Sequence, residues 1–161
     1  MNIVVGLGNL ARGDDAAGRL IARLLRKDPP AGVEIVECEG EGTALLDAIE
    51  AAAAAWLVDA CVSGGPPGAV HRFDATAAPL PDLGYGLSTH GFGLVEAIEL
   101  ARALARLPKR CVVYAIEGAS FDAGAPLSPP VAKAVAEVAR RLREEIVEAT
   151  ARESAIRPPR S

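Results

Sequence analysis

Four short, largely apolar runs rich in valine and isoleucine recur along the chain. They lack the strict alternation of a strand with one solvated face, and this pattern is typical of strands buried on both faces of a sheet. We therefore expect them to form the centre of a parallel sheet. The runs are Asn2 to Gly6, Val33 to Cys38, Ala55 to Ala60 and Cys111 to Ile116.

Between these runs, apolar residues recur at the spacing of amphipathic helices. Thr43 is expected to cap a helix that runs to about Ala53, and Ser128, which two prolines follow, is expected to begin the last helix. Strands and helices therefore alternate along the chain. The other predicted helical segments are Ala17 to Leu25 and Gly91 to Ala105, and the last helix reaches at least Ile146.

The segment Ala69 to Asp74 indicates a further strand. Only Val62 to Gly68 separates it from the preceding strand, whereas a parallel crossover requires about a dozen residues. We therefore place this strand antiparallel at an edge. The predicted fold class is α/β, a three-layer α/β/α sandwich with a mostly parallel five-stranded sheet and one antiparallel edge strand.

The composition limits the classes of function. The chain has 161 residues, half of them apolar, so we expect a single α/β domain over residues 1–151 and a disordered polar tail over 152–161. A net charge of -4 provides no source of phosphate neutralisation, which disfavours nucleic-acid binding. No signal-peptide pattern follows Met1 and no apolar stretch is long enough for a bilayer, so we expect a cytoplasmic protein. Three cysteines without paired metal spacing indicate buried thiols.

A glycine-rich turn follows the first strand. The run from Gly6 to Ala11 matches the relaxed dinucleotide fingerprint GxGxxA. Asp14 and Asp15 come next, however, where a pyrophosphate would lie, and like charges there would oppose phosphate binding. We interpret Asp14 as a helix cap and Asp15 as a ligand-binding or catalytic residue.

Two further polar residues are expected at the same edge of the sheet. Asp59 ends the apolar third strand, and His90 falls in the first turn of a predicted helix, where the helix dipole favours a neutral imidazole. Each alone could equally be a turn acceptor or a cap. With Asp15 they form an open set of two oxygens and one nitrogen that suits zinc, nickel or manganese. The other histidine, His71, is expected to be a surface residue with no companion acid.

Together these motifs resemble the hydrogenase maturation protease family, and the resemblance covers nearly all of the chain except the tail. It implies an endopeptidase that removes the C-terminal extension of the nickel-iron hydrogenase large-subunit precursor after nickel insertion. It further implies that Asp15, Asp59 and His90 bind metal and act in catalysis, with nickel supplied by the substrate and zinc or another divalent ion able to occupy the site in isolation. We expect a monomer that meets a large partner. The matching residues are Gly6 to Asn9, Asp14 to Gly18, Val58 to Ala60, Ser88 to Gly91, Ile116 to Gly118, Phe121, Gly124, Leu127, Ser128 and Val131.

The chain departs from the family pattern after its second strand. The family usually shows an aspartate and a Gly-Thr pair here, whereas this chain runs from Glu37 to Thr43 with three glutamates. We expect Glu37, Glu39 and Gly40 to help bind or orient the substrate.

Other functions stay open at this point. Peptidyl-tRNA hydrolases begin with a similar Val-Gly-Leu-Gly-Asn turn, but this chain lacks their Asn-His pair and a basic face. A non-catalytic nickel-binding chaperone would hold metal with the same three residues. An acyl-enzyme route through Cys61 is disfavoured, because a buried thiol without a paired histidine has no activating partner. Water activated by the metal or by a carboxylate fits the sequence equally well.

Overall fold

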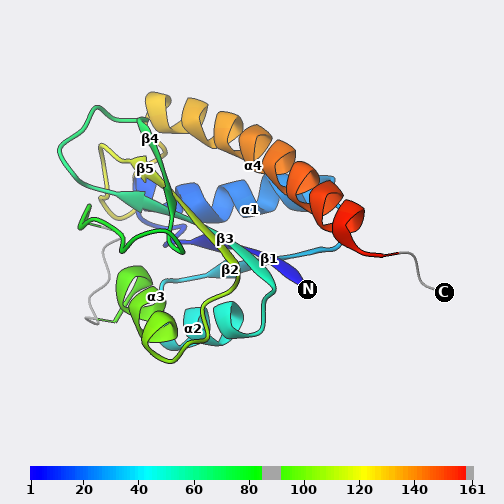
Figure 1. Ribbon diagram of the computed structural model, residues 1–161. Helices are drawn as coiled ribbons and strands as arrows, with labels where there is room; N and C mark the ends of the chain where they lie inside the picture. Colours follow the sequence, from blue (N-terminus) through cyan, green and yellow to red (C-terminus); the bar gives the residue numbers. More distant parts are fainter. Residues whose placement is uncertain (85–91, 159–161) are drawn as a thin grey trace.

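The computed structural model describes residues 1–84 and 92–158, in which a five-stranded sheet lies between two layers of helices (Figure 1). The strand order is β2-β1-β3-β5-β4. Neighbouring strands are parallel except β4, which pairs antiparallel with β5 at one edge. The predicted fold class, including the antiparallel edge strand, is confirmed. The strands are β1 (Asn2–Leu7), β2 (Val33–Cys38), β3 (Ala54–Cys61), β4 (Val70–Asp74) and β5 (Arg110–Glu117).

Helices cover both faces of the sheet. The helices α1 (Ala17–Lys27) and α4 (Pro129–Ile156) lie on one face, and α2 (Gly42–Glu50) and α3 (Leu94–Ala103) lie on the other (Figure 1). Because side chains alternate along a strand, Trp56 of β3 joins the core under α1 and α4, whereas Leu57 joins the core under α2 and α3. A short 3-10 helix, η1 (Gly13–Ala16), precedes α1.

The start of α2 differs from the prediction. Glu41 is the N-cap and makes no side-chain cap hydrogen bond, so the prediction that Thr43 caps this helix is wrong. The amide of Gly42 donates to the carbonyl oxygen of Phe92 at 3.1 Å. A Cβ on Gly42 would lie 1.9 Å from the Phe92 ring. The close approach of Phe92 therefore sets the helix start at a glycine.

The last helix begins as expected and ends later than expected. Ser128 is the N-cap of α4, with Pro129 in the first turn, but its side chain does not cap the helix. The helix continues to Ile156, so the first five residues of the expected tail, Arg152 to Ile156, are helical. None of the helices within residues 1–84 and 92–158 is long and apolar enough to cross a membrane.

Candidate active site

Two glycines bring η1 against the carboxyl ends of the central strands. β1 and β3 are parallel neighbours, so the turn after Leu7 and the residue Asp59 emerge at the same edge of the sheet. A Cβ on Gly18 would lie 2.3 Å from the Val58 carbonyl oxygen. Gly8 has φ +135°, and a Cβ there would lie 1.8 Å from the Asp15 carbonyl oxygen. The glycine turn therefore serves close packing of η1 on the sheet, and this packing places Asp15 near the end of β3.

Asp15 and Asp59 form a pair of buried carboxylates with few hydrogen-bond donors. Each is only 5% exposed. Asp15 Oδ2 accepts from the amide of Asn9 at 3.0 Å, and Asp59 Oδ1 accepts from the amide of Ala60 at 2.8 Å. Asp15 Oδ1 is buried and has no hydrogen-bond partner among the described residues. A buried carboxylate oxygen without a donor is unfavourable unless a proton or a cation compensates it.

The two negatively charged carboxylates repel each other. Burial, with the added repulsion of Asp15, raises the pKa of Asp59 to about 8. Burial also raises the pKa of Asp15, against the opposing effects of the Asn9 amide and of the positive charge of Arg12. When two carboxylates share such a site, one of them is protonated near neutral pH unless a cation binds. The oxygens of the two carboxylates, one of them without a donor in the part of the chain that the structure describes, thus fit a divalent cation.

Asp14 points to a different part of the chain from Asp15. Its carboxylate accepts from the amides of Ala119 at 2.7 Å, Ser120 at 3.0 Å and Ser128 at 2.7 Å, and from the Ser128 hydroxyl at 2.9 Å. Burial would raise the pKa of Asp14, but these hydrogen bonds outweigh it and lower the pKa. The prediction that Asp14 caps its own helix is therefore wrong. Asp14 lies within η1, and its carboxylate instead holds the loop between β5 and α4.

His90 belongs to residues 85–91 and lies outside the described residues. The structure therefore brings together Asp15 and Asp59 of the three expected metal ligands. The helix that we expected to contain His90 begins later, at Leu94, with Gly93 as its N-cap and the Gly93 amide donating to Glu96 Oε2 at 3.0 Å. His90 precedes this cap in the sequence, so the dipole of α3 gives no argument for its protonation state.

The sequence model of the hydrogenase maturation proteases matches residues 19–145, which is well over half of the chain. The chain belongs to the hydrogenase maturation protease family. The match includes Asp59 and His90, while Asp15 precedes it and is placed by the fold.

Individual proteins and solved structures are also similar to this chain. The hydrogenase expression/formation protein HupD of Thiocapsa roseopersicina is 26% identical over 132 residues, which make up 80% of this chain and 60% of HupD. The [NiFe] hydrogenase maturation protease HycI from Thermococcus kodakarensis KOD1 is 27% identical, with a TM-score of 0.71 over 91% of this chain and 92% of that one. The hydrogenase maturating endopeptidase HybD from E. coli has the same fold, with a TM-score of 0.72 and 24% identity over 95% and 93% of the two chains.

In this family member, Glu37 lies in an ion cluster beside α1. Arg19 and Arg23 each place Nε 3.0 Å from its carboxylate, and Arg26 also pairs with it. Burial would raise the pKa of Glu37, but the three guanidinium groups lower it. A sequence signal was available, because three arginines at positions 19, 23 and 26 share one face of a helix.

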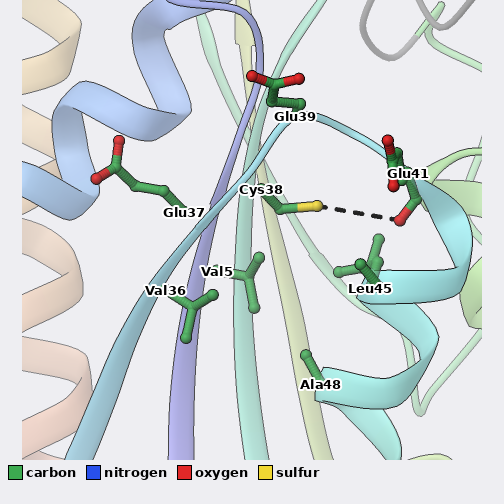
Figure 2. A pocket seen from close by; sticks show the side chains of 9 residues that line it. Val5, Val36, Glu37, Cys38, Glu39, Glu41, Leu45 and Ala48 are labelled. Carbon is green, nitrogen blue, oxygen red and sulfur yellow. Dashed lines mark hydrogen bonds between the residues drawn. The ribbon is translucent and has the colours of Figure 1, made fainter.

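Glu39 lines an open pocket of about 290 Å³ between β2 and α2, and Gly40 follows it in the chain. Figure 2 shows Cys38 directed toward α2 and Glu37 directed toward α1. The Glu39 side chain is 78% exposed, with one oxygen 3.7 Å from Arg19. Gly40 has φ +102°, and no atom of the described residues lies within 4 Å of its Cβ position, so it is a turn residue. Of the three residues expected to bind substrate, Glu37 is thus engaged by arginines, while Glu39 remains exposed beside the pocket.

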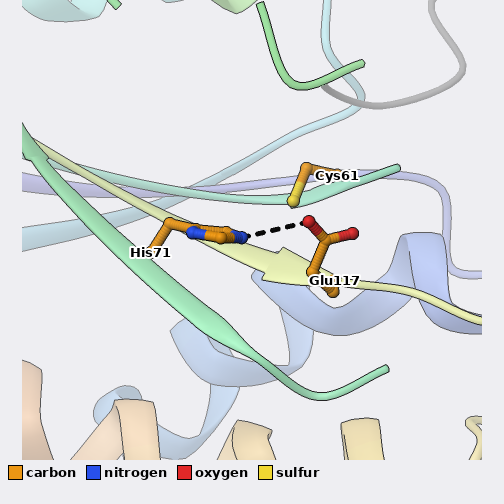
Figure 3. A group of neighbouring side chains, drawn as sticks. All are labelled: Cys61, His71 and Glu117. Atoms are coloured by element: carbon orange, nitrogen blue, oxygen red, sulfur yellow. Dashed lines mark hydrogen bonds and ion pairs between the residues drawn. The ribbon is translucent and has the colours of Figure 1, made fainter. Parts of the chain in front are cut away.

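The sequence did not reveal a second group of reactive side chains, formed by Cys61, His71 and Glu117. His71 Nε2 lies 3.0 Å from Glu117 Oε1, so the prediction that His71 has no companion acid is wrong. Cys61 lies beside both residues, contrary to our expectation that it has no nearby histidine (Figure 3). Burial and then the charge of Glu117 raise the pKa of Cys61 to about 12, so the thiol is protonated at neutral pH and is a poor nucleophile.

Proposed function

We propose that this protein is a cytoplasmic endopeptidase that removes the C-terminal extension of the nickel-iron hydrogenase large-subunit precursor after nickel insertion. Membership of the maturation protease family supports the peptide-bond chemistry and the kind of partner. The observation that carries the proposal is the buried pair Asp15 and Asp59. Their mutual repulsion, and an Asp15 oxygen with no hydrogen-bond partner in residues 1–84 and 92–158, favour a cation at the carboxyl edge of the sheet.

In this proposal the nickel ion of the precursor is part of the substrate. It docks against Asp15 and Asp59, with His90 as the third ligand. A precursor that carries nickel brings a positive charge that offsets the two negative carboxylates, whereas a nickel-free precursor does not. Cleavage thus depends on correct metallation. Zinc or another divalent ion can occupy the same oxygens in the isolated protein.

The proton on Asp59 gives a physical basis for this dependence. With the pKa of Asp59 at about 8, its carboxyl group is largely protonated at neutral pH and is a poor general base. A cation beside the pair favours the ionised form. Either carboxylate can then accept a proton from the attacking water, so the base becomes available when the metal-loaded precursor docks.

The deciding experiment mixes the purified protein with nickel-loaded and nickel-free precursor and follows precursor mass over time. We expect the nickel-loaded form to lose its C-terminal extension and the nickel-free form to remain intact. If the nickel-loaded precursor binds but keeps its extension, the protein is a nickel-binding chaperone and the protease proposal is wrong. Equal cleavage of both forms would contradict nickel recognition.

We also propose that the acidic segment after β2 helps bind the precursor, with Glu39 at the rim of the pocket as its accessible charge. The Glu39→Gln variant is expected to raise KM for the precursor by roughly 2- to 10-fold with little change in kcat, because a rim charge acts mainly on encounter. Glu34→Gln is the matched control. Glu34 is another exposed glutamate, on β2, and it lies outside the pocket lining. An unchanged KM in Glu39→Gln would contradict this role.

A further inference from the structure

Cys61, His71 and Glu117 converge from three adjacent strands at the carboxyl edge of the sheet. Cys61 of β3 is opposite Glu117 of β5 in the parallel register. His71 of β4 is opposite Ala115 of β5, two residues before Glu117, and is therefore its diagonal neighbour on the same face. One ligand atom from each side chain lies within 4.8 Å of the other two. Figure 3 shows the imidazole and the carboxylate directed toward each other beside the thiol.

The three donors match the chemistry of zinc. Zn²⁺ prefers sulfur, imidazole nitrogen and carboxylate oxygen, at about 2.3 Å from sulfur and about 2.0 to 2.2 Å from nitrogen and oxygen. A tetrahedral ion at those distances needs donor atoms roughly 3.3 to 3.6 Å apart. The observed 3.0 Å between His71 Nε2 and Glu117 Oε1 is close to that edge length. Small side-chain movements would complete the geometry.

Other contacts already orient two of the three ligands. The Ser63 amide donates to Glu117 Oε2 at 3.1 Å, and the Ser63 hydroxyl also contacts this carboxylate. The His71 ring stacks on Phe73, with centroids 6.1 Å apart and an interplanar angle of 10°. Outer contacts of this kind are what hold metal ligands in place in zinc sites.

The three side chains differ in burial. Glu117 is 1% exposed and Cys61 is fully buried, while the His71 side chain is 34% exposed. Three protein ligands leave the fourth position of a tetrahedral zinc ion for a water. Asp59 precedes Cys61 by two residues in the same strand, a rise of roughly 6.6 Å, so this group is a neighbour of the carboxylate pair and distinct from it.

We propose that Cys61, His71 and Glu117 form a second metal site that binds Zn²⁺ and fastens the edge strand β4 to the ends of β3 and β5. The site is independent of the nickel that enters with the precursor. The bound ion would displace the thiol proton of Cys61 and neutralise the buried charge of Glu117. Zinc then stabilises the sheet edge that adjoins Asp59.

Cobalt substitution tests the site, because Co²⁺ bound to a thiolate gives a near-ultraviolet charge-transfer band. The full chain is reduced, stripped of metal and used in the Asp15→Asn/Asp59→Asn background, which disables the carboxylate pair. We expect one equivalent of Co²⁺ to produce the thiolate band and Zn²⁺ to abolish it. Cys61→Ala should lose the band, while Cys38→Ala and Cys111→Ala should keep it. Absence of the band in the background protein, or its survival in Cys61→Ala, would overturn the proposal.

His71→Gln gives a second test at a partly exposed position, where folding is least affected. Zinc affinity, measured by competition with a chelator, is expected to fall by at least about 10-fold. Zinc should raise the Tm of the Asp15→Asn/Asp59→Asn protein but not that of the same protein carrying His71→Gln. Wild-type zinc affinity in His71→Gln would also overturn the site, whatever the outcome of the cleavage assay.

Discussion

Asp59→Asn is expected to lower kcat/KM for cleavage of the nickel-loaded precursor by about 10²- to 10⁴-fold, the usual range for loss of a general acid or base. Asparagine retains the shape and an acceptor for the Ala60 amide, but it can neither carry the charge that faces Asp15 nor accept a proton from water. Precursor mass at fixed times measures the rate. A variant that cleaves at the wild-type rate would remove Asp59 from the mechanism.

The pH dependence of stability provides the control for folding. The pKa of Asp59 is about 8 in the folded protein against an ordinary value of 3.8, so between these values the folded state holds a proton that the unfolded chain has released. Its contribution to stability is therefore fully present below about pH 4 and is lost as the pH rises through about 8. The asparagine side chain of the variant has no such proton. Between about pH 5 and about pH 9, the free energy of unfolding of the wild type should therefore fall by a few kcal/mol relative to that of Asp59→Asn.

Urea unfolding of metal-free protein at the two pH values measures this difference. A variant that gains relative stability at high pH yet fails to cleave would separate the catalytic role of Asp59 from any role in folding. A difference that stays constant with pH would show that Asp59 is already ionised in the folded protein.

The sheet could be predicted because its determinants are local. Each central strand is an apolar run, and the short segment between Cys61 and Val70 excludes a parallel crossover. The same reasoning placed Asp15 and Asp59 at one edge, because Asp15 follows β1 and Asp59 lies near the end of β3, and the carboxyl ends of these strands share that edge. Helix starts were less accurate, since α2 begins where Phe92 packs on Gly42, a contact between distant segments.

The parts of the site that could not be predicted depend on contacts between residues far apart in the sequence. The partners of Asp14 lie 105 to 114 residues further along the chain, so a helix cap was the nearest local explanation. The contact of His71 with Glu117 depends on the register of an antiparallel edge strand, which hydrophobic pattern does not specify to one residue. Once the register is known, alternation alone puts both residues on the face that also carries Cys61.

Asp14→Ala is expected to lower the free energy of unfolding by about 3 to 5 kcal/mol. The substitution removes the acceptor of four hydrogen bonds and leaves the amides of Ala119, Ser120 and Ser128 without a partner. Urea unfolding at neutral pH measures the loss. Asp122→Ala is the control, because Asp122 is an exposed acid in the same loop and its removal should change stability by less than about 0.5 kcal/mol.

The same substitution is expected to reduce cleavage, although Asp14 is not placed among the metal ligands. The Asp14 amide donates to the Ser120 carbonyl oxygen at 2.8 Å, so the loop and η1 hold each other from both directions. When the carboxylate is lost, the backbone hydrogen bond to Ser120 remains but the loop holds η1 less firmly, so Asp15 is less well fixed beside Asp59. Excess nickel-loaded precursor should restore part of the lost rate in Asp14→Ala, because docking of the ion favours the arrangement in which Asp15 lies beside Asp59. The same excess should not restore Asp59→Asn, where the charge itself is missing, and equal recovery in both variants would contradict a positioning role for Asp14.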